Sequence, residues 1–167
     1  MTNLVEVKTN ILRPFVDETI KALKSMAALE AEAGDFFEDD IEKFRFKGYA
    51  VATKTDGAIS GVILMHFYIE TALEIGNRVL GHIIGLEPAS EITEDIAAAL
   101  EEFGNTAIGL AMNDVVHSDE SLNFCPPFFI TNTEDMGPLL NDVNEVISAP
   151  ISVNGVGRFY FNYLIHS

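Results

Sequence analysis

The chain has 167 residues, which is enough for a single domain with a hydrophobic core. Acidic residues outnumber basic residues by 26 to 10, and a formal net charge of −16 argues against nucleic acid and anionic membranes as partners. The only cysteine, Cys125, leaves no internal disulfide and no thiolate zinc cluster possible.

The N-terminal part of the chain shows a helical pattern. Apolar residues recur at spacings of four and three over residues 16–31, which predicts a helix over residues 14–33. Pro14 suits the first turn of that helix, and Gly34 suits its end. Residues 1–9 are expected to form an extended N-terminal segment, and nothing in them is typical of a secretion signal.

A β-hairpin is predicted next, after an acid-rich stretch at 35–44 that is interpreted as a solvated loop or irregular strand. Two β-rich runs flank Asp56-Gly57, which is a favoured two-residue turn. The second run contains the longest apolar stretch, GVILMHFYI from Gly61, which is too short to cross a bilayer.

Two helices and a strand-rich C-terminal part complete the prediction. The helices are expected over residues 68–81 and from a capping Thr93 to about Val116. The sequence FFIT then predicts a short strand, the stretch Asn132 to Asp142 is interpreted as a polar loop, and two strands flank Asn154-Gly155. Residues 1–167 are therefore predicted to form one α+β domain, in which about three helices pack on a largely antiparallel sheet.

The pattern E-x-G-N-x-x-x-G occurs in both central helices, and two interpretations of its second copy stay open. It is either a functional site on an outward face or an ordinary exposed polar face with glycines tolerated for packing, and the E-x-x-N spacing alone favours the second interpretation. Glu102 and Asn105 fall opposite the apolar side of the helix, and Ala98 and Gly109 share their stripe. The glycines of this copy, Gly104 and Gly109, reduce bulk and are expected to let another surface approach.

The first copy of the pattern favours a structural role. Glu74 has a salt-bridge partner in Arg78 at the i,i+4 spacing. Asn77 falls near the buried side of its helix, on the stripe of Leu73 and Leu80.

Several stretches in order resemble one protein family: NILRPF, GYAVATKTDGAISGVILMHF, TALEIGNRVLG, EDIAAALEEFGNTAIG and APISVNGVGRFYFNYLI. From Asn10 to the C-terminus the chain resembles the CheX/CheC/FliY chemotaxis phosphatases, and the CheX type most closely. The pair Glu102 and Asn105 matches the E-x-x-N pair of that family, with Gly109 as its following glycine. CheC-type members carry a second motif on the first helix, where this chain has Glu18 and no matching asparagine.

The resemblance implies an enzyme that removes phosphate from the aspartate of a CheY-like response regulator. Asn105 would position the attacking water, and Glu102 would pair with a lysine of the regulator. Ala98 and Gly109 would lie in the contact with that partner. The resemblance also implies a homodimer with no cofactor of its own, because the regulator supplies the Mg²⁺ ion; the apolar content of 48% agrees with a buried subunit interface. A cytoplasmic location is expected from the sequence itself, which shows neither an apolar signal core nor a stretch long enough to span a bilayer.

Two other functions stay open. The family usually carries Asp or Ser where this chain has Ala98, so a non-catalytic module that only holds a response regulator is the alternative. A hydrolase or metal enzyme built on histidines is disfavoured, because no pair of the four histidines has a ligand spacing such as H-x-x-x-H. Cys125 has two prolines and no basic residue next to it, which indicates a structural role.

Overall fold

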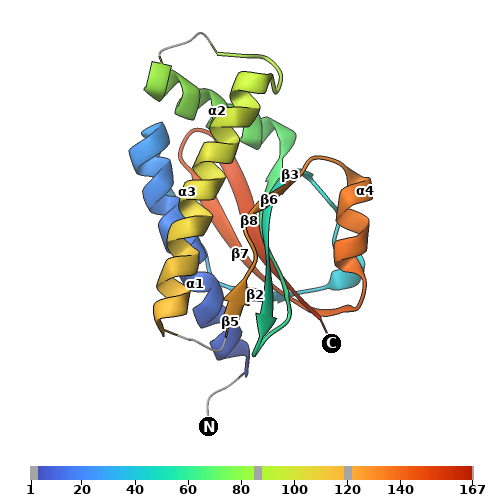
Figure 1. Cartoon of the computed structure of the whole chain (residues 1–167). Coiled ribbons are helices and arrows are strands. Elements are labelled where there is room, and N and C mark those ends of the chain that lie inside the picture. The colour runs from blue at the N-terminus through green and yellow to red at the C-terminus, as the bar shows by residue number, and fades with distance from the viewer. Residues whose placement is uncertain (1–3, 85–87, 119–121, 167) are drawn as a thin grey trace.

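The fold is a curled antiparallel sheet with three long helices on one face. The computed structural model describes residues 4–84, 88–118 and 122–166. The helices within these ranges are α1 (Leu4–Ala27), α2 (Ile69–Ile84), α3 (Glu94–Ser118) and the short α4 (Thr133–Met136), with 3₁₀ turns η1 (Ile41–Lys43) and η2 (Gly137–Leu140). Figure 1 shows α1, α2 and α3 on one side of the strands and α4 on the other.

Eight strands form the sheet in the part of the chain that is described. They are β1 (Ala31–Ala33), β2 (Phe37–Asp39), β3 (Gly48–Gly57), β4 (Gly61–Tyr68), β5 (Leu122–Phe124), β6 (Phe128–Ile130), β7 (Val143–Val153) and β8 (Gly157–His166). The order is β1-β7-β8-β4-β3-β5, with β2 also paired to β7 and β6 to β3. The α+β class predicted from the sequence is therefore confirmed.

Successive side chains along each strand point to opposite faces of the sheet, so each face has its own hydrophobic core. Side chains such as Val51, Met65 and Phe161 pack against the three long helices in the larger core. Their neighbours Ala52, Leu64 and others face the opposite side, where α4, η2 and the segment around η1 cover them. The strands are thus packed on both faces, and α3 lies on the face of the larger core.

The first helix differs from its prediction at both ends. It begins at Leu4, so the described part of the segment expected to be extended is helical, and Pro14 lies inside the helix rather than in its first turn. The helix ends at Ala27, where Ala28 adopts a left-handed conformation with φ 54°. Residues 31–33 instead pair with β7, because the alanine spacing that suggests a helix also fits a short edge strand.

Two loops are also different from the prediction. Asp56 and Gly57 belong to β3 and pair with β5, so the hairpin turns at residues 58–60 instead. The stretch Asn132 to Asp142 contains α4 and η2, and Asn132 caps α4 by accepting a hydrogen bond from the Asp135 amide. The predicted turn at Asn154-Gly155 is confirmed, and Gly155 has the positive φ of 76° that favours glycine there.

No helix of the described chain is long and apolar enough to cross a membrane.

Candidate active site

Helix α3 begins at a side-chain cap and packs along one side. Thr93 precedes it, and its hydroxyl accepts a hydrogen bond from the Ile96 amide at 3.2 Å, as the sequence predicts. Glu94 and Asp95 lie in the first turn, where the helix dipole favours negative charge. The fully buried side of the helix consists of Ile96, Leu100, Phe103, Ala107, Ile108 and Ala111.

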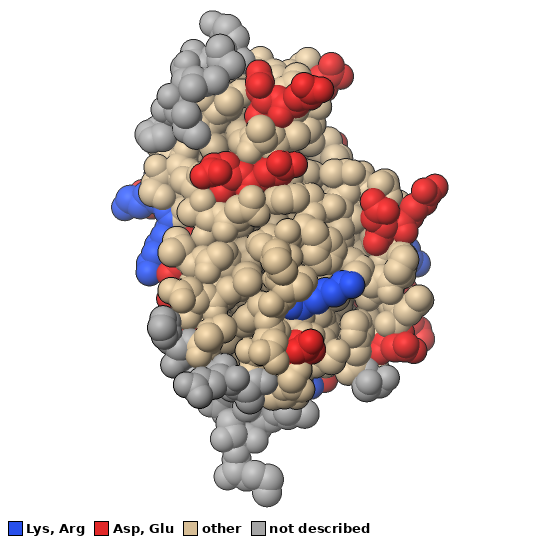
Figure 2. Space-filling view, viewed as in Figure 1, with Lys and Arg blue, Asp and Glu red and all other residues tan. Residues whose placement is uncertain are grey.

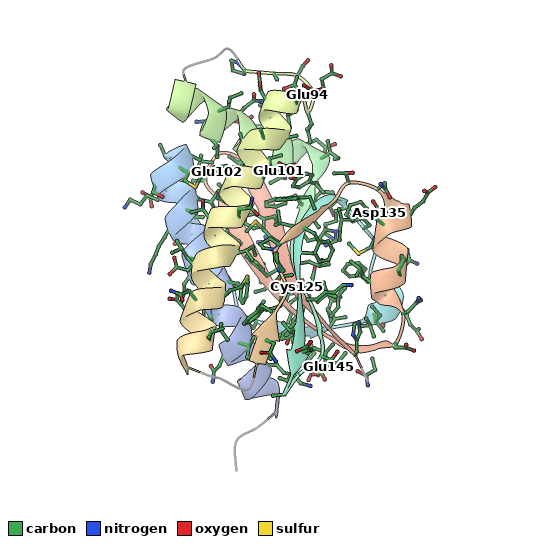
Figure 3. The ribbon with its side chains drawn as sticks, in the orientation of Figure 1. Glu94, Glu101, Glu102, Cys125, Asp135 and Glu145 are labelled. Atoms are coloured by element: carbon green, nitrogen blue, oxygen red, sulfur yellow. The ribbon has the colours of Figure 1, made fainter. Side chains whose placement is uncertain are left out.

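The candidate residues lie together on the opposite side of this helix. Glu102 and Asn105 are exposed, and Ala98 and Gly109 are exposed on the same stripe. Within the described chain, neither the Glu102 side chain nor the Asn105 side chain forms a hydrogen bond or an ion pair. The outward orientation predicted for all four residues is therefore confirmed, and two polar side chains of α3 are left available to another molecule. Figure 3 labels Glu102 on the outer side of this helix.

Gly104 faces the sheet, and this corrects its expected role. A methyl group at this position would lie 2.9 Å from Cγ2 of Val51 and 3.4 Å from the ring of Phe129. The glycine therefore lets α3 approach β3 closely, rather than making room for a partner. Gly109 has nothing within 4 Å of such a methyl group, which agrees with an open outer face.

A groove continues the outer face of α3 toward the C-terminal end of the helix. It has a volume of about 520 Å³ and is lined by Gly109, Met112, Asn113 and Val116 of α3 and by Leu122, Asn123 and Phe124 of β5. The α3 members recur at helical spacing after Glu102 and Asn105, so their positions could have been read from the sequence. The contribution of β5 could not, because no strand is predicted there.

The charge on this face is uneven. Figure 2 shows acidic side chains over the N-terminal half of α3, where Glu94, Glu101 and Glu102 lie, and a mostly uncharged surface with isolated charged groups beyond them. The candidate pair thus lies where an acidic region meets an apolar groove. Such a border suits a partner that presents a cation beside an apolar surface.

The first copy of the pattern has the structural role that the sequence predicts. Asn77 donates to the carbonyl of Ala89 at 2.9 Å and accepts from its amide at 2.7 Å. Glu74 pairs with Arg78 at 3.1 Å. A methyl group on Gly76 would lie 2.6 Å from Ile96, so this glycine brings α2 against α3. All of the polar groups of this copy are used within the chain.

The other candidate sites do not form a reactive group. Cys125 lies beside β3, where its sulfur accepts a hydrogen bond from the Lys54 amide at 3.1 Å. His66 and His166 lie on β4 and β8, while His82 and His117 lie in α2 and α3. In the described residues, no three metal-binding side chains come together.

The side chains of Glu102 and Asn105 on α3 can take part in only a few kinds of chemistry. A carboxamide can accept a hydrogen bond from water and hold that water in place, and a carboxylate can bind a cation. The arrangement therefore suits positioning a water molecule against a reactive group that another molecule brings.

Comparison with known families gives one match to a family model. Residues 49–139, which include Glu102 and Asn105, match the family described as chemotaxis phosphatase CheX. No curated protein sequence matches the chain.

Solved structures share the fold at low sequence identity. A CheC-like superfamily protein from Shewanella sp. PV-4 has a TM-score of 0.71 at 20% identity, over 99% of this chain and 100% of that chain. CheX from Vibrio vulnificus has a TM-score of 0.70 at 19% identity, over 94% and 99%. A chain of the CheX–CheY–BeF₃–Mg²⁺ complex from Borrelia burgdorferi has a TM-score of 0.68 at 23% identity, over 94% and 98%.

Proposed function

Because the chain belongs to the CheX family of chemotaxis phosphatases, we propose that it hydrolyses the phospho-aspartate of a CheY-like response regulator. The observation that carries the proposal is the exposure of Glu102 and Asn105 on one side of α3, with no partner for either in the described chain. Similarity to a chain of the CheX–CheY complex supports the choice of partner. The family match covers the helix that bears both residues.

The proposed mechanism uses Asn105 to position water. An aspartyl phosphate is already reactive, so its hydrolysis needs a water molecule in line with phosphorus and stabilisation of the developing charge. The carboxamide oxygen of Asn105 accepts a hydrogen bond from that water, and the helix fixes its direction. The regulator supplies the Mg²⁺ ion that stabilises the charge, and this chain uses no cofactor of its own.

The proposed role of Glu102 is to dock the two proteins. Its carboxylate binds a lysine of the regulator's active site, which places the phosphoryl group over Asn105. Ala98 and Gly109 lie against the regulator, and their small size lets its backbone come close to α3. The apolar groove beyond Gly109 extends the contact along the same helix.

The decisive experiment measures the decay of a phosphorylated CheY-like regulator with Mg²⁺ present. The wild-type protein should accelerate the decay, and Asn105→Ala should lose about a hundredfold or more of that acceleration while still binding the regulator. Glu102→Ala should weaken both binding and acceleration. Asn77→Ala, which removes the matching residue of the other copy, serves as the control and should stay active. An unchanged rate for Asn105→Ala would refute the mechanism.

A binding module without phosphatase activity is the second candidate, and Ala98 is the observation that favours it. Its methyl group lies on the exposed stripe where the family usually carries Asp or Ser. Under this alternative the wild-type protein binds the phosphorylated regulator without accelerating its decay, and Ala98→Asp creates or increases the activity. Equal rates for the wild type and Ala98→Asp, both well above the uncatalysed rate, would exclude it.

The proposal carries two expectations about the whole protein. Response regulators act in the cytoplasm, so we propose that this protein acts there too. The homodimer implied by the family resemblance is kept as a prediction.

A further inference from the structure

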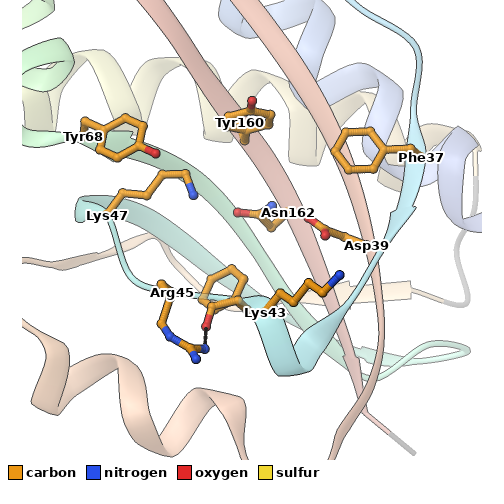
Figure 4. A pocket seen from close by; sticks show the side chains of 9 residues that line it. Phe37, Asp39, Lys43, Arg45, Lys47, Tyr68, Tyr160 and Asn162 are labelled. Atoms are coloured by element: carbon orange, nitrogen blue, oxygen red, sulfur yellow. Dashed lines mark hydrogen bonds between the residues drawn. The ribbon is translucent and has the colours of Figure 1, made fainter.

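A second pocket lies on the face of the sheet that the three long helices leave open. It has a volume of about 450 Å³, within the range of small-molecule sites. Its floor is formed by Tyr160 and Asn162 of β8 and by Tyr68 at the end of β4. Its walls come from β2, η1 and the segment that leads into β3, as Figure 4 shows.

The lining of this pocket is rich in basic side chains, although the protein as a whole is strongly acidic. Lys43, Arg45 and Lys47 line it, although the whole chain has only 10 basic residues. No carboxylate in the described chain forms a salt bridge with any of the three. The one carboxylate in the lining, Asp39, already accepts hydrogen bonds from the Ser148 hydroxyl and the Asp40 amide. The local charge is therefore opposite in sign to that of the molecule, which favours an anion.

The basic residues alternate with two phenylalanines in the sequence KFRFK, residues 43–47. The rings of Phe44 and Phe46 both stack on His66, with centroids 5.3 Å and 5.7 Å from its ring. The segment is thus anchored by its aromatic residues, while its three cations line the pocket. The core contact therefore fixes the backbone that carries the three cations. The guanidinium of Arg45 also donates to the backbone carbonyls of Glu42 at 3.0 Å and Phe44 at 2.7 Å, and its remaining N–H groups are left for an anion.

A chain of buried hydrogen bonds supports the floor of the pocket. The Lys47 amide donates to Nε2 of His66 at 2.9 Å, so the imidazole hydrogen resides on Nδ1 and donates to Asn162 at 2.8 Å. Asn162 donates to the Ser148 hydroxyl at 2.8 Å, which in turn donates to Asp39 at 3.1 Å. These hydrogen bonds link both walls of the pocket to the centre of the sheet, and they fix the direction of every donor among them.

Aromatic faces complete the lining. Nζ of Lys47 lies 5.4 Å from the ring centroids of both Tyr68 and Tyr160, so its charge sits between two aromatic rings. Tyr68 is 49% exposed and Phe37, on the opposite wall, is 41% exposed. Exposed rings beside cations can stack on a planar group while the cations bind its phosphate.

From these observations we propose that the pocket binds a small phosphorylated ligand with a planar ring, which is the chemistry of a nucleotide. Lys43, Arg45 and Lys47 bind the phosphate, and the exposed ring of Phe37 stacks on the planar ring of the ligand. The proposal does not rest on the phosphatase function, because Glu102 and Asn105 lie on the other side of the sheet.

The test is a calorimetric titration of the full chain with ADP and with its two fragments, pyrophosphate and adenosine. ADP should bind most tightly, pyrophosphate less tightly and adenosine least. The double variant Lys43→Gln/Arg45→Gln should bind ADP about tenfold or more weakly. Phe37→Leu, which removes an exposed ring that contacts none of the three cations, should weaken ADP binding and leave pyrophosphate binding unchanged.

A matched control removes two cations elsewhere. Lys21→Gln/Lys24→Gln changes the net charge equally on the exposed side of α1 and should leave ADP binding intact. Equal losses in both double variants, adenosine binding as tight as ADP binding, or no saturation at millimolar ADP would each overturn the proposal. Displacement of ADP by a polyglutamate peptide that binds more tightly would also overturn it, because the pocket would then be a protein-docking surface. Thermal melting curves confirm that each variant is folded.

Discussion

At the scale of single residues, two glycines of α3 have opposite surroundings. Gly104 is buried against Val51, whereas Gly109 is open to solvent. Alanine is the better helix former by about 1 kcal/mol at either position. Only at Gly104 does the added methyl group meet a stiff β-branched side chain in a packed core.

The two alanine variants should therefore change stability in opposite directions. We expect Gly109→Ala to raise the free energy of unfolding by about 0.5–1 kcal/mol, and Gly104→Ala to lower it by about 1–2 kcal/mol. Urea titration of both variants beside the wild type measures the difference. A stabilising effect of Gly104→Ala would show that α3 can move away from β3 at little cost.

A buried histidine should make stability depend on pH. Burial lowers the pKa of His66 from 6.5 to about 4; the hydrogen bond to Asn162 partly offsets this shift, and the nearby charge of Lys47 adds to it. As pH falls below 6.5 the unfolded chain takes up this proton before the folded chain does, so stability decreases down to about pH 4. Above pH 6.5 His66 is neutral in both the folded and the unfolded chain, so its titration does not change the free energy of unfolding. The full loss is on the order of 3 kcal/mol.

The His66 contribution can be separated from that of the many carboxylates. Denaturation of the wild type and of His66→Gln between pH 7 and pH 4 should give curves that diverge from about pH 6.5 downward, with the wild type losing more stability. Parallel curves would mean that His66 titrates normally in the folded protein.

At the scale of elements, the two copies of E-x-G-N divide structure from function. The Asn77 side chain holds the segment before α3 through two hydrogen bonds to Ala89, while the Asn105 side chain has no partner in the described chain. Both asparagines follow a glycine that packs its helix closely. The direction of the asparagine relative to the core decides between the two roles.

Substituting each asparagine should separate these roles experimentally. We expect Asn77→Ala to lower the free energy of unfolding by about 1–3 kcal/mol, because it leaves backbone groups of Ala89 without their partner. Asn105→Ala should leave stability within about 0.5 kcal/mol of the wild type. Chemical denaturation of both variants tests this. A larger destabilisation by Asn105→Ala than by Asn77→Ala would contradict the assignment.

Most long elements were predictable from the sequence and most short ones were not, although the bounds of α1 were wrong at both ends and FFIT did predict β6. α2 and α3 carry enough helical turns for their period to be clear, and β7 and β8 flank a local turn signal at Asn154-Gly155. In contrast, β1, β2 and β5 have three residues each, and their pairing with β7 or β3 decides their conformation. The spacing of the apolar residues in α3 correctly predicted that Glu102 and Asn105 face outward. The groove and the second pocket could not be predicted, because each needs residues from distant strands.

At the scale of the whole molecule, the association state is open to a direct measurement. Edge strands and exposed helix faces are the two kinds of surface through which the predicted homodimer can form. The outer strands β1 and β5 are short, which limits pairing with a second sheet. Leu110 and Val116 of α3 are 49% and 44% exposed, so the helical face offers apolar surface as well.

Sedimentation equilibrium at micromolar concentration should give about twice the chain mass of 18.3 kDa. The same measurement on Val116→Lys tests whether the α3 face takes part, because a charge there would weaken an apolar contact. A wild-type mass of one chain would refute the dimer.

The position of Gly104 also has a consequence for how such proteins can diverge. Of the four residues from Glu102 to Asn105, the inner pair, Phe103 and Gly104, is buried and holds the helix on the sheet. The outer pair, Glu102 and Asn105, faces solvent. Mutations in the outer pair leave the inner contacts untouched, so selection for folding does not protect them. A descendant can therefore lose Glu102 or Asn105 by drift and keep the same architecture. Among such descendants, a glycine at position 104 indicates common ancestry. Only the side chains at positions 102 and 105 indicate whether a descendant keeps the function.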